Sequence, residues 1–285
     1  MKAARSASSS RAGTACSAAP TAAPSSSGSP SRRTAGDENS AYWEAHKFAF
    51  YNHPATRAAF ARRYDRILGD AHRLVGPIRT VLDVGCGTGN FLDYAQSRGL
   101  DAYGIDLDPG AVAEARSRGL NAVTQGELGS AALPDRFDAM TMWDVIEHII
   151  DPLAALKALL PRVRPGGALL FETPDGGFPL RPAILGVHRV SRGRYDYTRP
   201  LYYWEHKIYF TERGFRALMQ RLGCEVVDVR RGTSVQEKMS AVFAFEAQRT
   251  GSRSLATLRR SFPLLATAAE RAHLGNKLLV VARVS

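Results

Sequence analysis

Short apolar runs alternate with helical segments along the middle of the chain, and this alternation limits the fold more than any other feature. The apolar runs, rich in Val, Leu and Ile, cover 80–84, 102–105, 121–124, 137–143 and 168–172, with helical segments over 90–98, 109–118 and 145–163 between them. A helix between successive strands predicts parallel pairing, and strands that are apolar throughout predict a sheet covered on both faces. We therefore expect an α/β fold with a doubly wound sheet.

The first 36 residues have a different composition from the rest. Residues 1–36 are mostly Ala, Ser, Gly, Thr and Pro, with five basic residues and no acidic one. Such a segment cannot bury enough apolar surface to offset the entropy of ordering, so we predict a disordered tail. The composition is also that of an organelle transit peptide, and a start codon assigned too early would produce the same segment. These three explanations stay open.

The charge is unevenly distributed. The net charge is +11, yet residues 37–172 hold 14 basic and 18 acidic residues, while residues 173–285 hold 19 basic and 9 acidic ones. A basic half suits phosphate, nucleic acid or an acidic substrate. No tight Lys/Arg run with interleaved aromatics is present, so we do not expect a nucleic-acid partner. The oligomeric state is left open.

Two compositional features bear on the cellular setting. No apolar run approaches the length of about 18–20 residues that a membrane span needs, so we expect none. The three cysteines, Cys16, Cys86 and Cys224, are too widely spaced for a disulfide framework or a zinc site of their own. We therefore predict a reducing compartment and a cytoplasmic protein.

The run "VLDVGCGTG" at 81–89 carries the strongest functional signal. A strand runs into a glycine loop and then into a helix, and glycines allow the backbone to approach a ligand closely. In open α/β sheets such a loop lies at the carboxyl edge, where nucleotides bind. The third glycine, Gly89, comes one position earlier than in the dinucleotide pattern G-x-G-x-x-G, and Asn90 follows it. The loop alone fits NAD or another nucleotide.

Asp106 closes the second strand, 21 residues after Gly85. A carboxylate at this place can accept two hydrogen bonds from the diol of an unphosphorylated ribose. The alternative is an aspartate that caps a helix, and Asp108, directly before Pro109, fits that role better.

Five ordered segments resemble the class I S-adenosylmethionine-dependent methyltransferases, and are most similar to the ubiquinone-biosynthesis-like branch, whose members mostly methylate small molecules. The segments are "VLDVGCGTG", "YGIDLDPGAVAEAR", "QGELGSAALPDRFDAM", "DVIEHIIDP" and "RVRPGGALLFETPD". The resemblance implies a Rossmann-like, seven-stranded mixed sheet. Its last strand, formed by "GNKLLVVARV", is expected to be antiparallel.

The resemblance also suggests how the chain is divided. We predict one methyltransferase domain over 37–285. Its expected parts are an N-terminal helical cap over 41–75, a cofactor-binding core over 79–172, an insertion after strand 5 that forms a substrate lid over 173–210, and a half that completes the sheet over 211–285.

The resemblance implies that the cofactor is S-adenosyl-L-methionine and names the residues that bind it. These residues are Asp83, Gly85, Cys86, Gly87, Asp106, Leu107, Glu127, Leu128 and Asp144. Asp83 suits the ammonium group of the cofactor, Asp106 its ribose and Glu127 its adenine amino group, while Asp144 would face the sulfonium. A solvated loop carboxylate is the alternative for Glu127.

Methyl transfer from a sulfonium needs positioning and desolvation but no nucleophilic residue, and a base is needed only if the acceptor must lose a proton. Histidine suits this role near neutral pH. We predict His148 as the catalytic residue, with His206 as a second candidate; for each, the alternative is a histidine that caps or packs. In ubiquinone-type enzymes an acid-x-x-Glu-His array, here Asp144, Glu147 and His148, has been linked to a divalent cation. We predict no metal, because Glu-His is common at this place in family members that bind no metal.

The predicted function is methyl transfer to a small molecule, more at oxygen than at carbon or nitrogen. Aromatic residues and arginines between 174 and 210 favour an aromatic, carboxylate or sugar-type acceptor. The alternatives are C- or N-methylation, a NAD-dependent oxidoreductase on a related fold, and a methyltransferase-like protein that binds without catalysis.

Overall fold

The computed structural model describes residues 48–126, 133–193, 205–234 and 271–285, and within 240–269 it describes residues 240, 251, 260, 261, 263, 264 and 266–269. The predicted tail over 1–36 lies outside the described residues. The domain boundaries therefore remain predictions.

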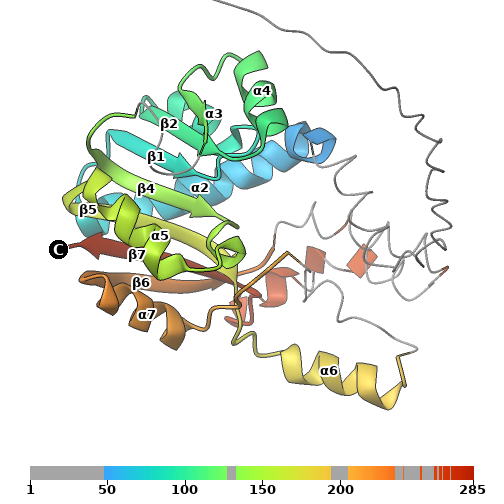
Figure 1. Cartoon of the computed structure of the whole chain (residues 1–285). Coiled ribbons are helices and arrows are strands. Elements are labelled where there is room, and N and C mark those ends of the chain that lie inside the picture. Colours follow the sequence, from blue (N-terminus) through green and yellow to red (C-terminus); the bar gives the residue numbers. More distant parts are fainter. Residues whose placement is uncertain are drawn as a thin grey trace, which may run out of the picture.

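A seven-stranded mixed sheet forms the centre of the molecule (Figure 1). Its strands are β1 (Thr80–Val84), β2 (Asp101–Asp106), β3 (Val123–Gln125), β4 (Phe137–Trp143), β5 (Val163–Pro174), β6 (Cys224–Gly232) and β7 (Lys277–Val284). The order is β3-β2-β1-β4-β5-β7-β6, with β1 to β5 parallel and β7 antiparallel to both β5 and β6. The predicted fold class, including the antiparallel last strand, is confirmed.

Helices cover both faces of this sheet. They are α2 (Pro54–Val75), α3 (Asn90–Ser97), α4 (Pro109–Ser117), α5 (Pro152–Leu159), α6 (Arg181–Val190) and α7 (Glu212–Arg221), with the 3-10 turns η1 (Ile146–His148) and η2 (Leu160–Arg162). Side chains of α2, α3 and α4 pack into one buried cluster, and those of α5 and α7 pack into another. The sheet is therefore doubly wound.

Alternation along the strands supplies both clusters. Val81 packs with the α2 side of the sheet and Leu82 with the α5 side, and both are fully buried. In β7, Val281 and Val280 divide in the same way. Successive strand residues point to opposite faces, so a sheet covered on both sides needs apolar residues at nearly every position.

Helix ends lie where the sequence places its capping residues. The Asp108 carboxylate accepts hydrogen bonds from the amides of Gly110 and Ala111 and so caps α4, while Thr211 caps α7 through the Gly214 amide. Glycines with positive φ follow three of the helices: Gly99 at 75°, Gly119 at 85° and Gly223 at 71°. Such glycines end helices without the strain that a side chain would cause.

Two segments differ from the sequence prediction. The run Arg-Pro-Gly-Gly at 164–167 predicts a turn, yet it belongs to β5, because Val163 already pairs with Phe137 before the ladder resumes at Ala168. The insertion predicted over 173–210, whose many Gly, Pro, Arg and Tyr residues favour irregular structure, contains α6, which has no buried residue and extends away from the sheet (Figure 1). The apolar residues of α6 recur at helical spacing, so the sequence contains a signal for this helix that the prediction missed. None of the described helices is both long and apolar enough to span a membrane.

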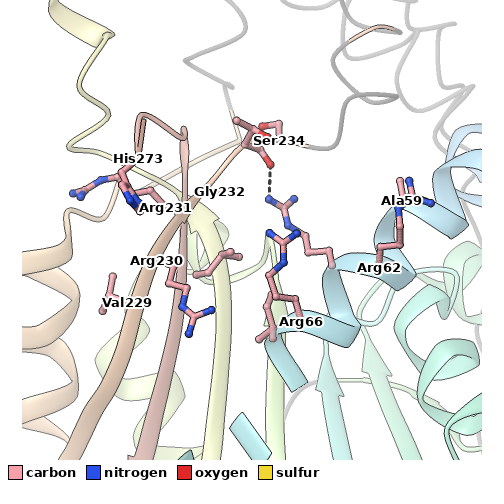
Figure 2. Close-up of a pocket in the computed structure, with 13 residues that line it drawn as sticks. Ala59, Arg62, Arg66, Val229, Arg230, Arg231, Gly232, Ser234 and His273 are labelled. Carbon is pink, nitrogen blue, oxygen red and sulfur yellow. Dashed lines mark hydrogen bonds between the residues drawn. The ribbon is translucent and has the colours of Figure 1, made fainter. Parts of the chain in front are cut away.

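A groove between α2 and β6 is rich in arginine (Figure 2). Its volume is about 650 Å³. Arg62, Arg63 and Arg66 line it from α2, and Arg230 and Arg231 line it from β6. We call it the arginine groove.

We expect Phe215→Ala to lower the free energy of unfolding by about 3–5 kcal/mol, the usual cost of truncating a buried phenylalanine. Phe215 on α7 is fully buried, with ring centroids 5.0 Å from Phe171 and 5.3 Å from Phe210. Urea unfolding followed by circular dichroism measures the change. Gln220→Ala, at an exposed position of the same helix, is the control and should stay within about 0.5 kcal/mol of the wild type. A similar small change for both variants would contradict the packing described here.

Candidate active site

Three glycines shape the loop that follows β1. Gly85, Gly87 and Gly89 have φ values of 72°, 55° and 82°, which favour glycine. A Cβ atom at Gly85 would lie 2.5 Å from the side chain of Val145, and one at Gly89 would lie 2.3 Å from Leu120. At Gly87 no atom lies within 4 Å of such a Cβ. The outer glycines thus allow close packing, while the middle one leaves backbone open to a ligand.

A cleft of about 990 Å³ lies at the carboxyl ends of β1, β2 and β4. It brings together eight of the predicted site residues: Asp83, Gly85, Cys86, Gly87, Asp106, Leu107, Asp144 and His148. Glu127 and Leu128 lie outside the described residues. The predicted residues that the structure describes thus meet in one place, as expected for the carboxyl edge of a doubly wound sheet.

The lining of the cleft is acidic. Seven carboxylates line it: Asp83, Asp106, Asp108, Asp144, Asp151, Glu172 and Glu205. No lysine or arginine is among the described residues of the lining. Carboxylates that surround a partly enclosed space create a negative potential, so the cleft favours a positively charged ligand.

Asp83 is the most deeply buried of these carboxylates. Its side chain is 1% exposed, and Oδ1 accepts a hydrogen bond of 2.6 Å from the Thr141 hydroxyl. Burial raises the pKa of Asp83 to about 8, although the Thr141 bond acts in the opposite direction, and Asp106 adds to the rise. A cation bound beside Asp83 would favour its ionised form.

Asp106 joins two loops at the mouth of the cleft. Its Oδ2 accepts a hydrogen bond of 2.7 Å from the Gly87 amide, and its Oδ1 accepts one of 2.9 Å from the Asp108 amide. A carboxylate oxygen can accept more than one hydrogen bond, so Asp106 retains acceptor capacity for a ligand. The cap of α4 is Asp108, so the structure separates the two aspartates as the sequence suggested.

Two carboxylates of the cleft have cationic partners behind it. Lys277, the first residue of β7 and 6% exposed, forms an ion pair with Asp144. Arg63 on α2 lies 2.9 Å from a carboxylate oxygen of Glu172. Sequence reasoning missed both partners; the one visible signal for Lys277 is a lone lysine at the start of an apolar strand. Asp83 and Asp106 have no ion pair with a described lysine or arginine.

Two histidines meet beside the cleft. The rings of His148 in η1 and His206 lie 4.8 Å apart in an edge-to-face arrangement. His206 Nδ1 is 3.1 Å from the Tyr209 hydroxyl, and its Nε2 is 3.8 Å from Oε1 of Glu147. The two candidate bases of the sequence analysis therefore belong to one cluster.

Glu147 is fully buried beneath these histidines. Burial and the nearby Asp144 raise the pKa of Glu147 to about 8, while Lys277 and a bond from Thr173 oppose the rise. Thr173 donates to its Oε2 at 3.0 Å, and Oε1 has no hydrogen-bond partner among the described residues. Glu147 is therefore poised to share a proton with His206.

The same cluster contains the side chains that could hold a metal. The ligand atoms of Glu147, His148 and His206 lie within 4.8 Å of one another. This set differs from the array considered in the sequence, since Asp144 is paired with Lys277 and His206 takes its place. Two imidazoles and one carboxylate suit zinc or another transition ion better than Mg²⁺, which prefers oxygen ligands. The absence of a metal remains a prediction.

Aromatic side chains form the wall of the cleft on the α2 side. Phe48, Tyr51, Phe60, Tyr64 and Trp143 line it. The rings of Tyr64 and Trp143 lie 4.8 Å apart. The indole N–H of Trp143 is buried and has no hydrogen-bond partner among the described residues. A ligand that accepts a hydrogen bond from it would offset the free-energy cost of burying this donor.

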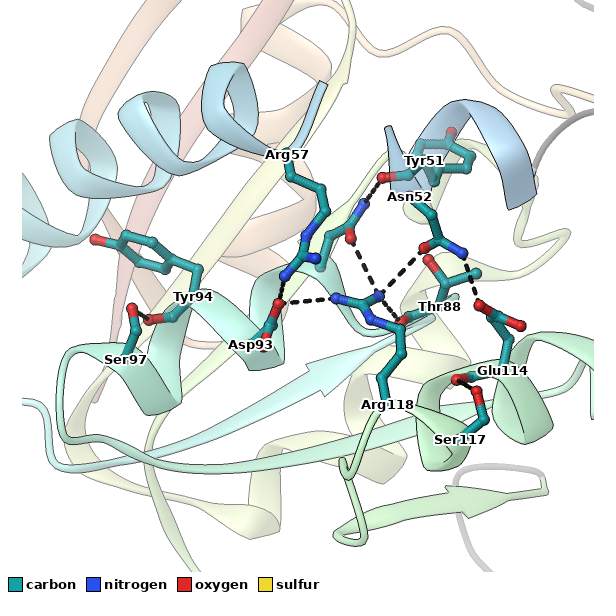
Figure 3. Close-up of polar contacts among 11 residues, drawn as sticks. Tyr51, Asn52, Arg57, Thr88, Asp93, Tyr94, Ser97, Glu114, Ser117 and Arg118 are labelled. Atoms are coloured by element: carbon teal, nitrogen blue, oxygen red, sulfur yellow. Dashed lines mark hydrogen bonds and ion pairs between the residues drawn. The ribbon is translucent and has the colours of Figure 1, made fainter. Parts of the chain in front are cut away.

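Polar contacts connect Tyr51 and Asn52, which precede α2, to the residues around the glycine loop (Figure 3). Arg118 donates to the Thr88 carbonyl and to the Asn52 side chain, and Asn90 Nδ2 donates to the Tyr51 carbonyl at 2.8 Å. Asn90 is the residue that stands where the dinucleotide pattern has glycine. It holds Tyr51 over the cleft, a role that the sequence did not reveal.

The sheet order, the antiparallel β7 and the glycine loop followed by the carboxylate of Asp106 are those of the class I S-adenosylmethionine-dependent methyltransferase family. The family model described as "Methyltransferase domain" matches residues 46–229, and the chain belongs to this family. The alternative of a NAD-dependent oxidoreductase is thereby set aside.

Curated relatives match part of the chain. A ubiquinone biosynthesis O-methyltransferase of Azoarcus sp. (strain BH72) is 32% identical over 133 residues, which cover 42% of this chain and 57% of the relative. The protein of that name from Xanthomonas campestris pv. campestris (strain B100) is 35% identical over 133 residues, which cover 43% and 54%. The match thus spans somewhat more than half the length of these relatives.

Solved structures share the fold. Magnesium protoporphyrin IX methyltransferase from Synechocystis PCC 6803, determined with bound S-adenosylhomocysteine (SAH), aligns with a TM-score of 0.52 at 16% identity, covering 86% of this chain and 97% of that one. A SAM-dependent methyltransferase from Archaeoglobus fulgidus aligns with a TM-score of 0.51 at 18% identity, covering 85% and 99%. At these identities the likeness is one of fold.

The raised pKa values of Asp83 and Glu147 predict that these side chains destabilise the free protein at high pH. A carboxyl group whose pKa is raised by folding contributes stability that is complete below its ordinary pKa and lost as the pH rises toward its folded pKa, here about 8. Asp83→Asn and Glu147→Gln should therefore raise the free energy of unfolding at pH 8 by about 1 kcal/mol or more, and by less at pH 5. Urea unfolding at both pH values measures this.

Asp138→Asn is the control of opposite sign. Although burial acts to raise it, hydrogen bonds from the Thr80 and Arg79 amides and from Arg164 lower the pKa of Asp138. This variant should lose stability at pH 8. A loss at pH 8 for Asp83→Asn as well would show that Asp83 is not penalised by burial.

Proposed function

We propose that this protein transfers the methyl group of S-adenosylmethionine to an oxygen atom of a small-molecule acceptor. The observation that carries the proposal is the acidic cleft, in which Asp83 and Asp106 lack cationic partners among the described residues. The cofactor carries a sulfonium and an ammonium, so its charge complements that lining. The O-methyltransferase names of the curated relatives support oxygen as the acceptor atom.

The residues at the carboxyl ends of β1 and β2 would hold the cofactor. The carboxylate of Asp83 would hold its ammonium group, and the open backbone at Gly87 would let its methionyl part approach. Asp106 accepts hydrogen bonds from the ribose hydroxyls while it holds the loop through Gly87. Leu107, which is 68% exposed on the rim, would pack near the adenine. Cys86, buried at the base of the loop, contributes shape, since burial raises the pKa of its thiol far above the range of a reactive thiolate.

The reaction needs a proton acceptor more than a nucleophile. When bound, S-adenosylmethionine supplies a methyl group activated by the positive charge on sulfur. His148, on the wall of the cleft, takes the hydroxyl proton of the acceptor as the new oxygen–carbon bond forms and the sulfur–carbon bond breaks. The products are a methylated acceptor, SAH and an imidazolium, which then loses its proton to water.

His206 acts as a positioning residue for His148. Its ring packs edge-to-face on that of His148, and Tyr209 and Glu147 contact its two nitrogens. Because His206 is held by these contacts and packs on His148, the imidazole of His148 loses little entropy when the acceptor binds. The aromatic wall of Tyr51, Tyr64 and Trp143 suits a flat acceptor, so an aromatic metabolite heads the proposed acceptor classes, followed by carboxylate and sugar-type molecules.

A thermal-shift comparison of SAH with NADH tests the cofactor assignment. SAH should raise the melting temperature and NADH should not. Asp106→Ala should weaken SAH binding by about 1–3 kcal/mol, as expected when a charged hydrogen-bond partner is removed. Asp101→Ala, at the exposed amino end of the same strand, should bind SAH like the wild type. Stabilisation by NADH alone would refute the proposal.

His148→Ala should lower transfer of a labelled methyl group into a metabolite extract by about 100-fold or more, the lower end of what a general base contributes. SAH affinity should be unchanged, because His148 is not proposed to hold the cofactor. His72→Ala, at an exposed position near the end of α2, is the control. If His148→Ala keeps wild-type transfer between pH 6 and pH 9, a range that spans the ordinary histidine pKa, His148 is not the base.

A further inference from the structure

The arginine groove has a lining of opposite charge to the cleft. Five arginines line it, and no acidic residue is among its described lining residues. Figure 2 shows Arg62 and Arg66 on α2 across from Arg230 on β6, whereas the side chain of the neighbouring Arg231 is directed away from them, toward Asp175 and Glu212. At about 650 Å³ the groove has the size of a small-molecule site.

Three of the arginines are fixed by carboxylates that do not line the groove. Arg63 contacts Glu172. Arg230 contacts Asp70 and Asp228, and Arg231 contacts Asp175 at 2.8 Å. These ion pairs hold the guanidinium groups in place from behind and cancel most of their charge. They make a rigid polar surface with nitrogen donors left over, because a guanidinium has five N–H groups.

The other two arginines have no acidic partner in the part of the chain that the structure describes. Arg62 and Arg66 are exposed and four residues apart, so they lie on the same side of α2. Like charges at this spacing repel each other by about 0.2–0.5 kcal/mol. An anion that contacts both would remove this repulsion and gain charge-assisted hydrogen bonds.

The guanidinium of Arg63 and the residues that follow β6 form the floor of the groove. A Cβ atom at Gly232 would lie 2.8 Å from Nη2 of Arg63, so glycine leaves room for that guanidinium. Beyond it, the Ser234 hydroxyl oxygen accepts a hydrogen bond of 2.8 Å from Asn276, which leaves its proton available for donation. Several donors from α2 and from the end of β6 thus converge on one space.

We propose that the arginine groove binds the phosphate or diphosphate group of the acceptor. Two arginines without an acidic partner among the described residues supply more donors than one carboxylate can use, whereas a phosphate has three terminal oxygens and a diphosphate more. The groove adjoins the cleft, because the Arg63–Glu172 pair has one member in the lining of each. This inference rests on the proposed function, since it assigns a chemical class to the acceptor.

Calorimetry with inorganic pyrophosphate tests the groove directly. The wild type should bind it, and the double variant Arg62→Gln/Arg66→Gln should bind at least about tenfold more weakly, because each charged hydrogen bond contributes more than the 1.4 kcal/mol that corresponds to tenfold. Arg213→Gln/Arg221→Gln, at exposed positions on α7, removes the same charge elsewhere and should keep wild-type affinity. Equal weakening in both variants, or no binding to the wild type, would overturn the proposal.

Further measurements distinguish a phosphorylated metabolite from a lipid headgroup, and distinguish a failure of the groove proposal from a failure of the proposed function. Phosphatase treatment of the metabolite extract should abolish methyl labelling by the wild type; labelling that survives treatment would overturn a phosphorylated acceptor. Binding to phosphatidylglycerol vesicles that is lost in Arg62→Gln/Arg66→Gln, without pyrophosphate binding, would assign the groove to a lipid headgroup instead. SAH binding, followed by thermal shift, should be equal in all variants; its absence from the wild type would refute the proposed function while pyrophosphate binding still reports on the groove.

Discussion

The carboxylate of Asp106 connects the two loops on which the site depends. It accepts hydrogen bonds from the Gly87 amide and from the Asp108 amide, and so ties the glycine loop after β1 to the start of α4. Asp106 can do this because β1 and β2 are parallel neighbours whose carboxyl ends meet at the same edge of the sheet. The bond fixes the backbone of Gly87 in a left-handed conformation that the glycine adopts without strain. A single side chain therefore shapes the mouth of the cleft and remains able to accept bonds from a ligand.

Local patterns were sufficient to predict the strands, and the family resemblance supplied the mixed sheet with its antiparallel last strand and most of the candidate site residues. The period of the apolar residues located the strands, and Asp108 located the start of a helix, because these signals act within a few residues of the structure they determine. The contacts that the sequence did not reveal are long-range. Lys277 meets Asp144 across 133 positions, and no local pattern records such a pairing. The helix α6 is a different case, because its apolar residues do recur at helical spacing and the prediction missed that local signal.

The buried carboxylates of Asp83 and Glu147 lower the stability of the free protein. Asp83 and Glu147 are buried with too few partners to favour their ionised forms, and the free protein would be more stable without that burial. Functional sites commonly carry such penalties, since groups arranged for a ligand are incompletely satisfied before it binds. A cation beside Asp83 would offset part of the cost of burying that carboxylate. A proton shared between Glu147 and His206 would offset part of the cost of burying Glu147. One of these carboxylates thus lies on the cofactor side of the proposed reaction and the other on the side of the proposed base.

The separation of charge argues against a dinucleotide more strongly than the spacing of the glycines does. A chain with a net charge of +11 nevertheless lines its main cleft with seven carboxylates and no described lysine or arginine. It collects five arginines in a groove on the other side of the Arg63–Glu172 pair. The pyrophosphate of NAD in the cleft would face the carboxylates of Asp83 and Asp106, whereas a sulfonium nucleoside would be attracted there. In the groove the preference is reversed. An acceptor with an anionic end would therefore be held with that end away from the cofactor, and its reactive part would be directed across the ion pair into the cleft.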